Sequence, residues 1–203
     1  DHSIIPSSKY DTINQNTAFI QNYAFVSKPT LNLVYIGMNV NVPPFNNPRF
    51  RQAIYHAVDT KRIVREITKR GSIPSKGILP PGIAGFNPHM EGYSYDPEKA
   101  RRLLEEIGYP KGRGIPPIEI WTVSKSESVQ NELKAYQDYL VALGIRLVPR
   151  VAENWSEFVK HIDEKKAPMY YAAWYADYPD PDNFLYVLCH SQSKTNRLGY
   201  QNG

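Results

Sequence analysis

The sequence predicts an α/β protein in which helices flank a mixed sheet. Strand-like and amphipathic helical runs alternate through the second half of the chain in the order β-α-β-α-β. That order favours parallel strands joined by right-handed crossovers. Helix-capping residues precede the helical runs, and glycines follow several of them. The 203 residues, 41% of them hydrophobic, can form a packed core in one sizeable domain or two small ones.

Composition and charge narrow the class of protein. Seventeen prolines and fifteen tyrosines indicate many loops and a surface rich in aromatic contacts. The net charge of +4 is spread along the chain, and the one dense basic run, residues 61–70, is interrupted by apolar residues at helical spacing. That pattern is typical of a solvated helix face, so nucleic acid is not an expected partner. No membrane-spanning run or signal peptide is recognisable, and the start at Asp1 leads us to expect a piece of a longer protein.

The first elements follow from local propensity and capping. Residues 1–30 are polar and irregular, and we expect only a short helix or loop there. Residues 31–39 are rich in β-prone side chains and predict a strand. Asn47 followed by Pro48 predicts a helix start, with an apolar stripe after it that faces the core.

Two more helices and a long loop follow. Asp59 is placed to cap a helix that Gly71 would end in the left-handed conformation. Residues 72–95 contain Pro and Gly throughout and predict a long loop, of the kind that is usually functional or wrapped on a partner surface. The Asp-Pro pair at residues 96–97 opens a helix that Gly108 closes.

The second half of the chain alternates regularly. The expected elements are strands at residues 118–123, 145–151 and 169–175, and helices at residues 128–143 and from Asn154 onward. Asn154 and Glu157 have the spacing of a capping box, which supports the start of the last of these helices.

Residues 170–185 join the last strand to a run of turn residues. The first half of this stretch is aromatic and apolar, whereas Pro and Asp punctuate the second half, which we interpret as turns. Asp177 follows the strand, and the carboxyl ends of strands in α/β sheets are where such folds bind ligands. Trp174 offers a flat apolar surface nearby, so a cation or an amine would suit the pair. The alternative is that Asp177 starts a turn and Trp174 fills the core.

The sequence carries little of the chemistry of metal sites and hydrolases. Its five histidines lack metal-ligand spacing, and the adjacent Cys189 and His190 would point apart on a strand. No phosphate-binding glycine loop follows a strand, and no nucleophile elbow is present. We therefore expect no metal, no cofactor and no catalytic residue, and we rank an enzyme below a binding protein.

Two carboxylate arrangements stay open as alternatives. Asp177, Asp180 and Asp182 could bind calcium through a loop, but the glycine and the distal glutamate of the helix-loop-helix calcium site are missing, which favours a turn. A glycosidase would need two carboxylates facing each other across a cleft. Asp177 with Glu119 or Glu153 could serve, although nothing in the spacing selects them.

Four stretches carry motifs whose order and spacing match as a set. They are Pro-Pro-Phe-Asn-Asn-Pro-Arg-Phe-Arg-Gln-Ala-Ile at residues 43–54 with the Asp at 59, the loop at 71–82, Tyr-Asp-Pro-Glu-Lys-Ala at 95–100, and the segment at 174–185. Together they resemble the solute-binding proteins of peptide-type ABC importers, the family that includes the oligopeptide- and dipeptide-binding proteins.

The resemblance implies a fold and a domain organisation. The fold would be a periplasmic-binding-protein-like lobe of the type II, large peptide-binding class. Residues 31–203 would form the second lobe of a considerably longer, two-lobed receptor, and residues 1–30 an irregular lead-in at the end of the first lobe or at the hinge. We therefore expect one exposed, aromatic-rich face that includes Trp174 and the loop at 72–95.

The resemblance also implies a binding mode. In the family, an extended peptide pairs as a strand with backbone at the positions that match Ala173 and Tyr175. The Trp that matches Trp174 lines a side-chain pocket. The Asp that matches Asp177 holds the amino terminus of the peptide.

The implied function is extracytoplasmic binding of an oligopeptide or dipeptide and its delivery to an ABC transporter permease. The receptor would act in the periplasm or at the cell surface, with a lipid anchor as one option. Its partners would be the peptide or another small solute, the permease and the first lobe of the same chain. Oligosaccharide or nickel binding is the alternative, and a carboxylate-based hydrolase is a further one. Tyr171 and Ile162 occupy the neighbourhood where some members place basic side chains for the peptide carboxylate, so the ligand length stays open.

Overall fold

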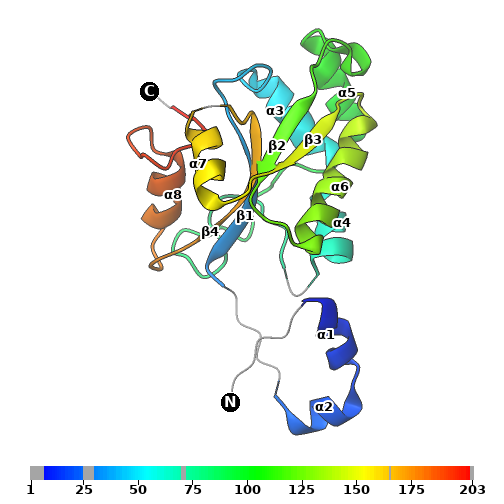
Figure 1. The fold of residues 1–203 in the computed structure, drawn as a ribbon, viewed down its shortest axis with the longest axis vertical. Helices are drawn as coiled ribbons and strands as arrows, with labels where there is room; N and C mark the ends of the chain where they lie inside the picture. Colours follow the sequence, from blue (N-terminus) through cyan, green and yellow to red (C-terminus); the bar gives the residue numbers. More distant parts are fainter. Residues whose placement is uncertain (1–6, 25–29, 70–71, 165, 202–203) are drawn as a thin grey trace.

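The protein is built around a four-stranded sheet with helices on both faces (Figure 1). The computed structural model describes residues 7–24, 30–69, 72–164 and 166–201. The strands are β1 (Asn32–Met38), β2 (Ile118–Thr122), β3 (Leu147–Val151) and β4 (Met169–Tyr175), and their order in the sheet is β1-β4-β2-β3. The predicted α/β class with a mixed sheet is confirmed.

The directions of the strands follow from the connections between them. β2 pairs in parallel with both β3 and β4, as the β-α-β-α-β order predicts. β1 comes from the first half of the chain and pairs antiparallel with β4 along its whole length, from Asn32 opposite Tyr175 to Met38 opposite Met169. The mixed character of the sheet therefore rests on β1 alone.

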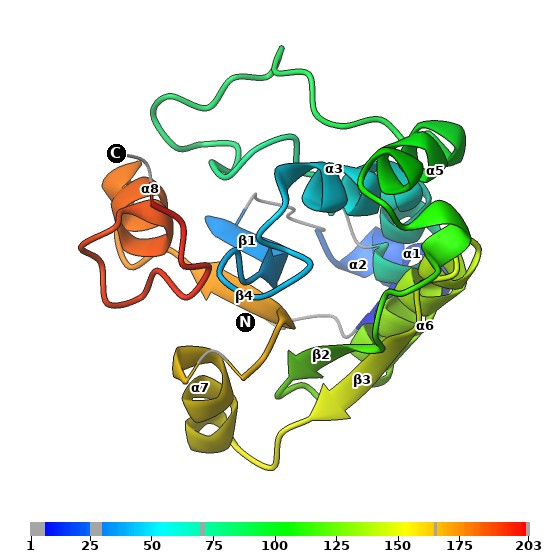
Figure 2. The ribbon, with the colours of Figure 1, turned by 90° about the horizontal axis from the view of Figure 1, so that it is seen from above.

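Helices cover the two faces of the sheet separately, as the view from above shows (Figure 2). One face carries α3 (Pro48–Ala57), α5 (Pro97–Glu106) and α6 (Glu127–Val141). Their apolar stripes form the main core with the buried side chains of the strands, including Phe50, Leu104, Leu133, Ile120 and Met169. The other face carries α7 (Trp155–Asp163), whose Phe158 and Ile162 pack against Tyr170.

The predicted helix starts are confirmed by their caps. The side chain of Asn47 accepts a hydrogen bond from Arg49 N at 2.9 Å, and that of Asp96 accepts one from Lys99 N at 2.9 Å. Asn154 caps α7 in the same way. Each cap satisfies a backbone N–H that the first turn of a helix leaves without a partner.

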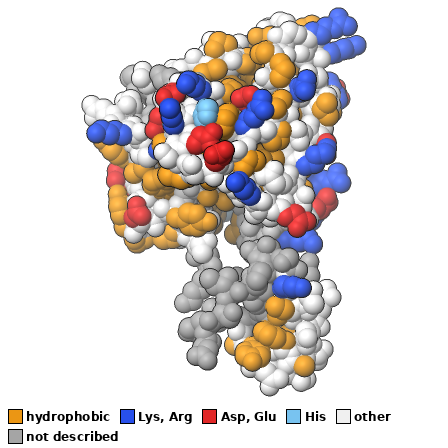
Figure 3. All heavy atoms as spheres, in the orientation of Figure 1, with side chains coloured by type: hydrophobic (Ala, Val, Ile, Leu, Met, Phe, Trp, Pro, Cys, Tyr) orange, Lys and Arg blue, Asp and Glu red, His pale blue; other side chains and the backbone are white. Residues whose placement is uncertain are grey.

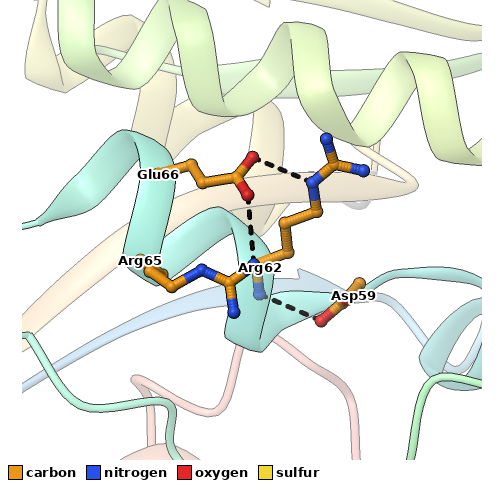
Figure 4. Close-up of polar contacts among 4 residues, drawn as sticks. All are labelled: Asp59, Arg62, Arg65 and Glu66. Carbon is orange, nitrogen blue, oxygen red and sulfur yellow. Dashed lines mark hydrogen bonds and ion pairs between the residues drawn. The ribbon is translucent and has the colours of Figure 1, made fainter.

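The basic run forms a short α-helix that continues into one π-helical turn. Asp59 caps α4 (Thr60–Ile63) by accepting from Arg62 N at 2.9 Å, and η1 (Val64–Thr68) follows directly. Arg62 and Arg65 both pair with Glu66, at 2.8 and 3.1 Å (Figure 4). Exposed pairs of this kind add little stability. The predicted solvated helix face is thus confirmed, while Gly71, its expected end, lies outside the described residues.

Charges of both signs are also interspersed on the visible surface. Figure 3 presents the face that carries α7, and Lys and Arg side chains alternate there with Asp and Glu. A mixed surface of this kind has no single strong potential with which to attract a polyanion.

Two expectations from local sequence are wrong. Residues expected to continue as turns after the Asp-Pro run form α8 (Asp182–Cys189), because Phe184 and Leu188 lie four residues apart and pack into a third apolar cluster. Cys189 is therefore the last residue of a helix and His190 its C-cap, rather than neighbours on a strand.

The amino-terminal residues are more regular than the sequence indicates. They form α1 (Ser7–Asn14) and α2 (Thr17–Asn22), the latter capped by Asn16. These two short helices stand apart from the sheet (Figure 1). A further short element, η2 (Pro110–Gly112), follows α5.

Candidate functional site

The candidate site lies at the carboxyl end of β4, where one edge of the strand has no neighbour. β1 pairs with β4 along all seven residues, whereas β2 pairs with it only at Met169 and Tyr170. Within the described residues, no strand pairs with residues 172–175 on the side of β4 that faces away from β1. We call that side of residues 172–175 the free edge.

The backbone groups at the free edge can be assigned from one hydrogen bond. Ala176 N–H donates to Leu31 O at 2.8 Å, so the backbone of Ala176 faces β1. Successive residues of a strand direct their N–H and C=O groups to opposite edges. Trp174 therefore also faces β1, and the backbone groups of Ala173 and Tyr175 face the free edge.

The side chains of the same residues alternate between the two faces of the sheet. Ala173 and Tyr175 lie on one face, where both are exposed, Tyr175 to 66%. Trp174 lies on the other face and is half-buried, with its indole Nε1 donating to Asn183 Oδ1 at 2.9 Å. Its ring packs against the cluster formed by Phe184 and its neighbours.

Part of the long loop covers Trp174. Ile78, Leu79 and Ile83 belong to the same apolar cluster as Trp174 and α8, and Ile83 is only 4% exposed. The expectation that Trp174 and the whole loop at 72–95 form an exposed face is therefore wrong, because this half of the loop closes the small core around α8. The remaining large apolar side chains of the loop are exposed, and they are Ile73, Phe86, Met90, Tyr93 and Tyr95.

Asp177 is the exposed carboxylate closest in sequence to the free edge. It comes two residues after β4 ends, and within the described part of the chain its side chain makes no hydrogen bond or ion pair. The other two aspartates behave as turn residues: Asp180 Oδ1 accepts from Asp182 N at 2.8 Å, and Asp182 Oδ2 accepts from Tyr178 Oη at 3.1 Å. Asp177 takes no part in these contacts and remains available.

The contacts also bear on the metal and hydrolase alternatives. Among the residues that the structure describes, no group of three or more His, Cys, Asp or Glu side chains could hold a metal ion. Glu119, one candidate partner of Asp177 in a hydrolase, is bound to Arg150 at 2.8 Å and to Trp121 Nε1 at 3.1 Å. These contacts engage both carboxylate oxygens of Glu119.

Sequence reasoning missed a buried carboxylate next to the free edge. Glu132 of α6 is 7% exposed, and it accepts hydrogen bonds from Tyr171 Oη at 2.9 Å and Thr68 Oγ1 at 3.1 Å. Burial raises the pKa of Glu132, and these two hydrogen bonds limit the rise. Its place could have been found from the sequence, because it lies three residues after Val129 and four before Tyr136, within the apolar stripe of that helix.

Comparison with known protein families identifies the family of this chain. The sequence model described as "Bacterial extracellular solute-binding proteins, family 5 Middle" matches residues 1–196. The chain belongs to this family. The family predicted from the four motifs is therefore confirmed.

Individual relatives agree with the assignment. Heme-binding protein A of Haemophilus influenzae is 33% identical over 170 residues, which are 82% of this chain and 30% of the relative. The dipeptide-binding protein of Escherichia coli is 29% identical over 164 residues, which are 79% of this chain and 30% of the relative. The chain thus spans about a third of the length of these curated relatives.

Solved structures show the same fold. HbpA2 from Haemophilus parasuis superimposes with a TM-score of 0.84 at 28% identity, covering 98% of this chain and 39% of that protein. The periplasmic binding protein DppA from Helicobacter pylori, in complex with the peptide STSA, has a TM-score of 0.82 at 27% identity and covers 96% and 37%. The predicted fold of a periplasmic-binding-protein lobe is confirmed. None of the described helices is long and apolar enough to cross a membrane.

Proposed function

We propose that this chain is part of an extracytoplasmic receptor that binds an extended peptide and delivers it to an ABC transporter permease. The observation that carries the proposal is the free edge of β4, with the backbone groups of Ala173 and Tyr175 directed to it and the carboxylate of Asp177 just beyond it. Backbone groups at an edge favour an extended chain as partner, because a peptide can pair with them as an added strand.

The roles of the residues follow from this arrangement. The peptide backbone would exchange hydrogen bonds with Ala173 and Tyr175. Its amino terminus would lie near Asp177, whose charge has no other partner among the described residues. Trp174 would present its ring to a side-chain pocket, since its only polar atom is already bonded to Asn183.

The rest of the receptor lies in sequence that the relatives have and this chain does not cover. We propose that residues 31–203 form one lobe, that residues 1–30 lead in from the other lobe or the hinge, and that the peptide is enclosed between the two. The exposed side chains of Val34, which lies opposite Ala173 on β1, and of Tyr175 are on the same face of the sheet and suit such an interface. The receptor would act in the periplasm or, with a lipid anchor, at the cell surface.

Other solutes remain as alternatives within the same receptor class. The relatives' names include heme, dipeptide and glutathione as ligands, and oligosaccharides or nickel are further candidates. A strand edge with an unpaired carboxylate beside it favours a peptide with a free amino terminus, such as a dipeptide, over heme, an oligosaccharide or nickel. It also favours binding without turnover.

The test is calorimetry on the intact receptor. One peptide is compared with its amino-terminally acetylated form, and reduced glutathione, heme, an oligosaccharide and a nickel salt are tested alongside. We expect the free peptide to bind and the acetylated one to bind at least about tenfold more weakly, because acetylation removes the charge that Asp177 would hold. Binding of heme or sugar without any peptide binding would overturn the proposal, and so would hydrolysis of the bound peptide.

A further inference from the structure

The free edge is blocked at one end by β2. Trp121 pairs with Tyr170, so the next residue of β2, Thr122, lies opposite Tyr171 and is the last residue of that strand. A peptide added along the free edge takes the place that β2 would occupy if it were longer. It can therefore run from Asp177 only as far as Ala172, where it meets the end of β2 beside Tyr171. We call the position of Tyr171 the closed end.

The distance between these two points limits the ligand. Asp177 and Tyr171 are six residues apart, which corresponds to about 20 Å in an extended chain. A peptide whose amino terminus lies at Asp177 would thus reach the closed end within about six residues.

The hydrogen-bonding capacity of Tyr171 is already partly used. Its hydroxyl donates to Glu132 Oε2 at 2.9 Å, and Thr68 Oγ1 donates to the other oxygen of the same carboxylate at 3.1 Å. A phenol has one proton to donate. With that proton held by Glu132, the phenolic oxygen can only accept a hydrogen bond from a ligand.

The buried carboxylate of Glu132 beside the closed end also favours a ligand group that donates a hydrogen bond. Glu132 is buried and has no cationic partner in the part of the chain that the structure describes. Burial and the charge of Glu132 both raise the pKa of Tyr136, which lies one turn further along the same helix. An exposed lysine, Lys125, lies in the segment that connects β2 to α6.

We propose that Tyr171, positioned by Glu132, makes the closed end select a hydrogen-bond donor and reject a free carboxylate. The preferred ligands are peptides that present an amide, an amine or a guanidinium group there. A carboxylate can only accept hydrogen bonds, and it would meet both the lone pairs of the phenol and the charge of Glu132. This inference rests on the proposed function, because it describes the far end of the same peptide.

The experiment uses the intact receptor and one peptide series of two to six residues. Each peptide is made with a free carboxylate and as the carboxyl-terminal amide, and calorimetry gives the ratio of the two dissociation constants. At the length that reaches the closed end, we expect the amide to bind about tenfold more tightly to the wild type. Tyr171→Phe should bring that ratio close to one, and Glu132→Gln should lower it, because the amide side chain carries no charge.

A matched control removes a tyrosine hydroxyl that lies on α6, the helix of Glu132, but outside the contacts between Tyr171, Glu132 and Thr68. Tyr139→Phe should keep the wild-type ratio, since Tyr139 contacts Tyr95 and not Glu132. Thermal melts of each variant identify any loss of folding. If Glu132→Gln does not fold, Tyr171→Phe still decides the outcome, because it removes only one oxygen atom.

Three results would overturn the inference. One is a wild-type ratio near one at every length. Another is a ratio that Tyr171→Phe leaves unchanged. The third is a preference for the free carboxylate that Lys125→Gln removes, which would make Lys125 the residue that reads the ligand terminus. If the peptides bind but the ratio of the two dissociation constants does not change in Tyr171→Phe, this inference alone is refuted. If no peptide binds at all, the proposed function is refuted as well.

Discussion

The two halves of β4 have similar sequences and opposite surroundings. Met169 and Tyr170 are 0% and 2% exposed, and strands pair with them on both sides. Ala173 and Tyr175, a few residues later, are exposed and pair on one side only. Aromatic and apolar side chains continue throughout, so hydrophobicity does not separate the core from the site. The length of the neighbouring strand does.

The buried half is also packed tightly against β1. Tyr170 lies opposite Gly37, where a Cβ atom would come within 2.2 Å of the tyrosine ring. The ring makes edge-to-face contacts with Tyr35, at a centroid distance of 6.0 Å, and with Phe158, at 6.4 Å. Among the residues that the structure describes, no comparable ring contact involves Tyr175, whose side chain is 66% exposed.

The largest expected effect comes from truncating the buried half. Tyr170→Ala should lower the free energy of unfolding by about 3–5 kcal/mol, because it removes a buried aromatic ring and leaves a cavity. Tyr175→Ala is the matched change in the exposed half and should alter it by no more than about 0.5 kcal/mol. Urea unfolding of both variants measures the difference. Equal losses would show that the two halves of β4 are not energetically distinct.

Just beyond the exposed half, at Asp177, the expected loss is in binding rather than stability. Asp177→Asn keeps the shape of the side chain but removes its charge, so the affinity of the intact receptor for a peptide with a free amino terminus should fall by about 1.5–3 kcal/mol. That is roughly a tenfold to hundredfold rise in Kd. The melting temperature should not change.

Calorimetry with two controls checks this result. Asp180→Asn, in the adjacent turn, should leave affinity intact, because Asn can still accept the hydrogen bond from Asp182 N. The acetylated peptide should be nearly indifferent to Asp177→Asn. Equal weakening of both peptides would show that Asp177 does not hold the amine.

A smaller effect should come from the contact between β1 and the buried half. Gly37→Ala forces a methyl group against the ring of Tyr170 and should destabilise the fold by about 1–3 kcal/mol. In the double variant with Tyr170→Ala the ring is gone, so the two losses should be less than additive by about 1 kcal/mol or more. Additive losses in urea unfolding would mean that Gly37 is needed for another reason.

The smallest expected effect is on the pH dependence of stability, and it comes from Glu132, beneath the boundary between the two halves. Burial raises the pKa of Glu132 above its ordinary value of 4.5, so the folded state binds this proton more tightly than the unfolded state. The contribution of Glu132 to stability is therefore greatest at low pH and falls as pH rises from the ordinary pKa through the raised one.

Urea unfolding between about pH 4 and pH 8 measures this effect when the wild type is compared with Glu132→Gln. The stability of the wild type relative to the variant should decline with rising pH, because Gln does not titrate. A difference that stays constant with pH would mean that Glu132 has the same pKa in both states.

The sequence alone determined the elements whose signals are local. Asn47, Asp96 and Asn154 cap their helices as predicted, since each cap acts within three residues of itself. β4 has the bounds that its run of apolar residues indicates, and the alternation of elements predicted the parallel pairing of β2, β3 and β4. Four motifs also identified the family, because their order along the chain is itself a sequence property.

The tertiary structure decided what depends on neighbours that are distant in the sequence. Turn residues before Phe184 masked α8, which is stabilised by packing against the loop at 72–95. Glu132 reads as an ordinary helix residue until Thr68 and Tyr171 are brought to it from other elements. Above all, the free edge of β4 exists because β2 ends at Thr122 and pairs in one particular register. Neither the length of a partner strand nor its register is encoded in the residues of β4 themselves.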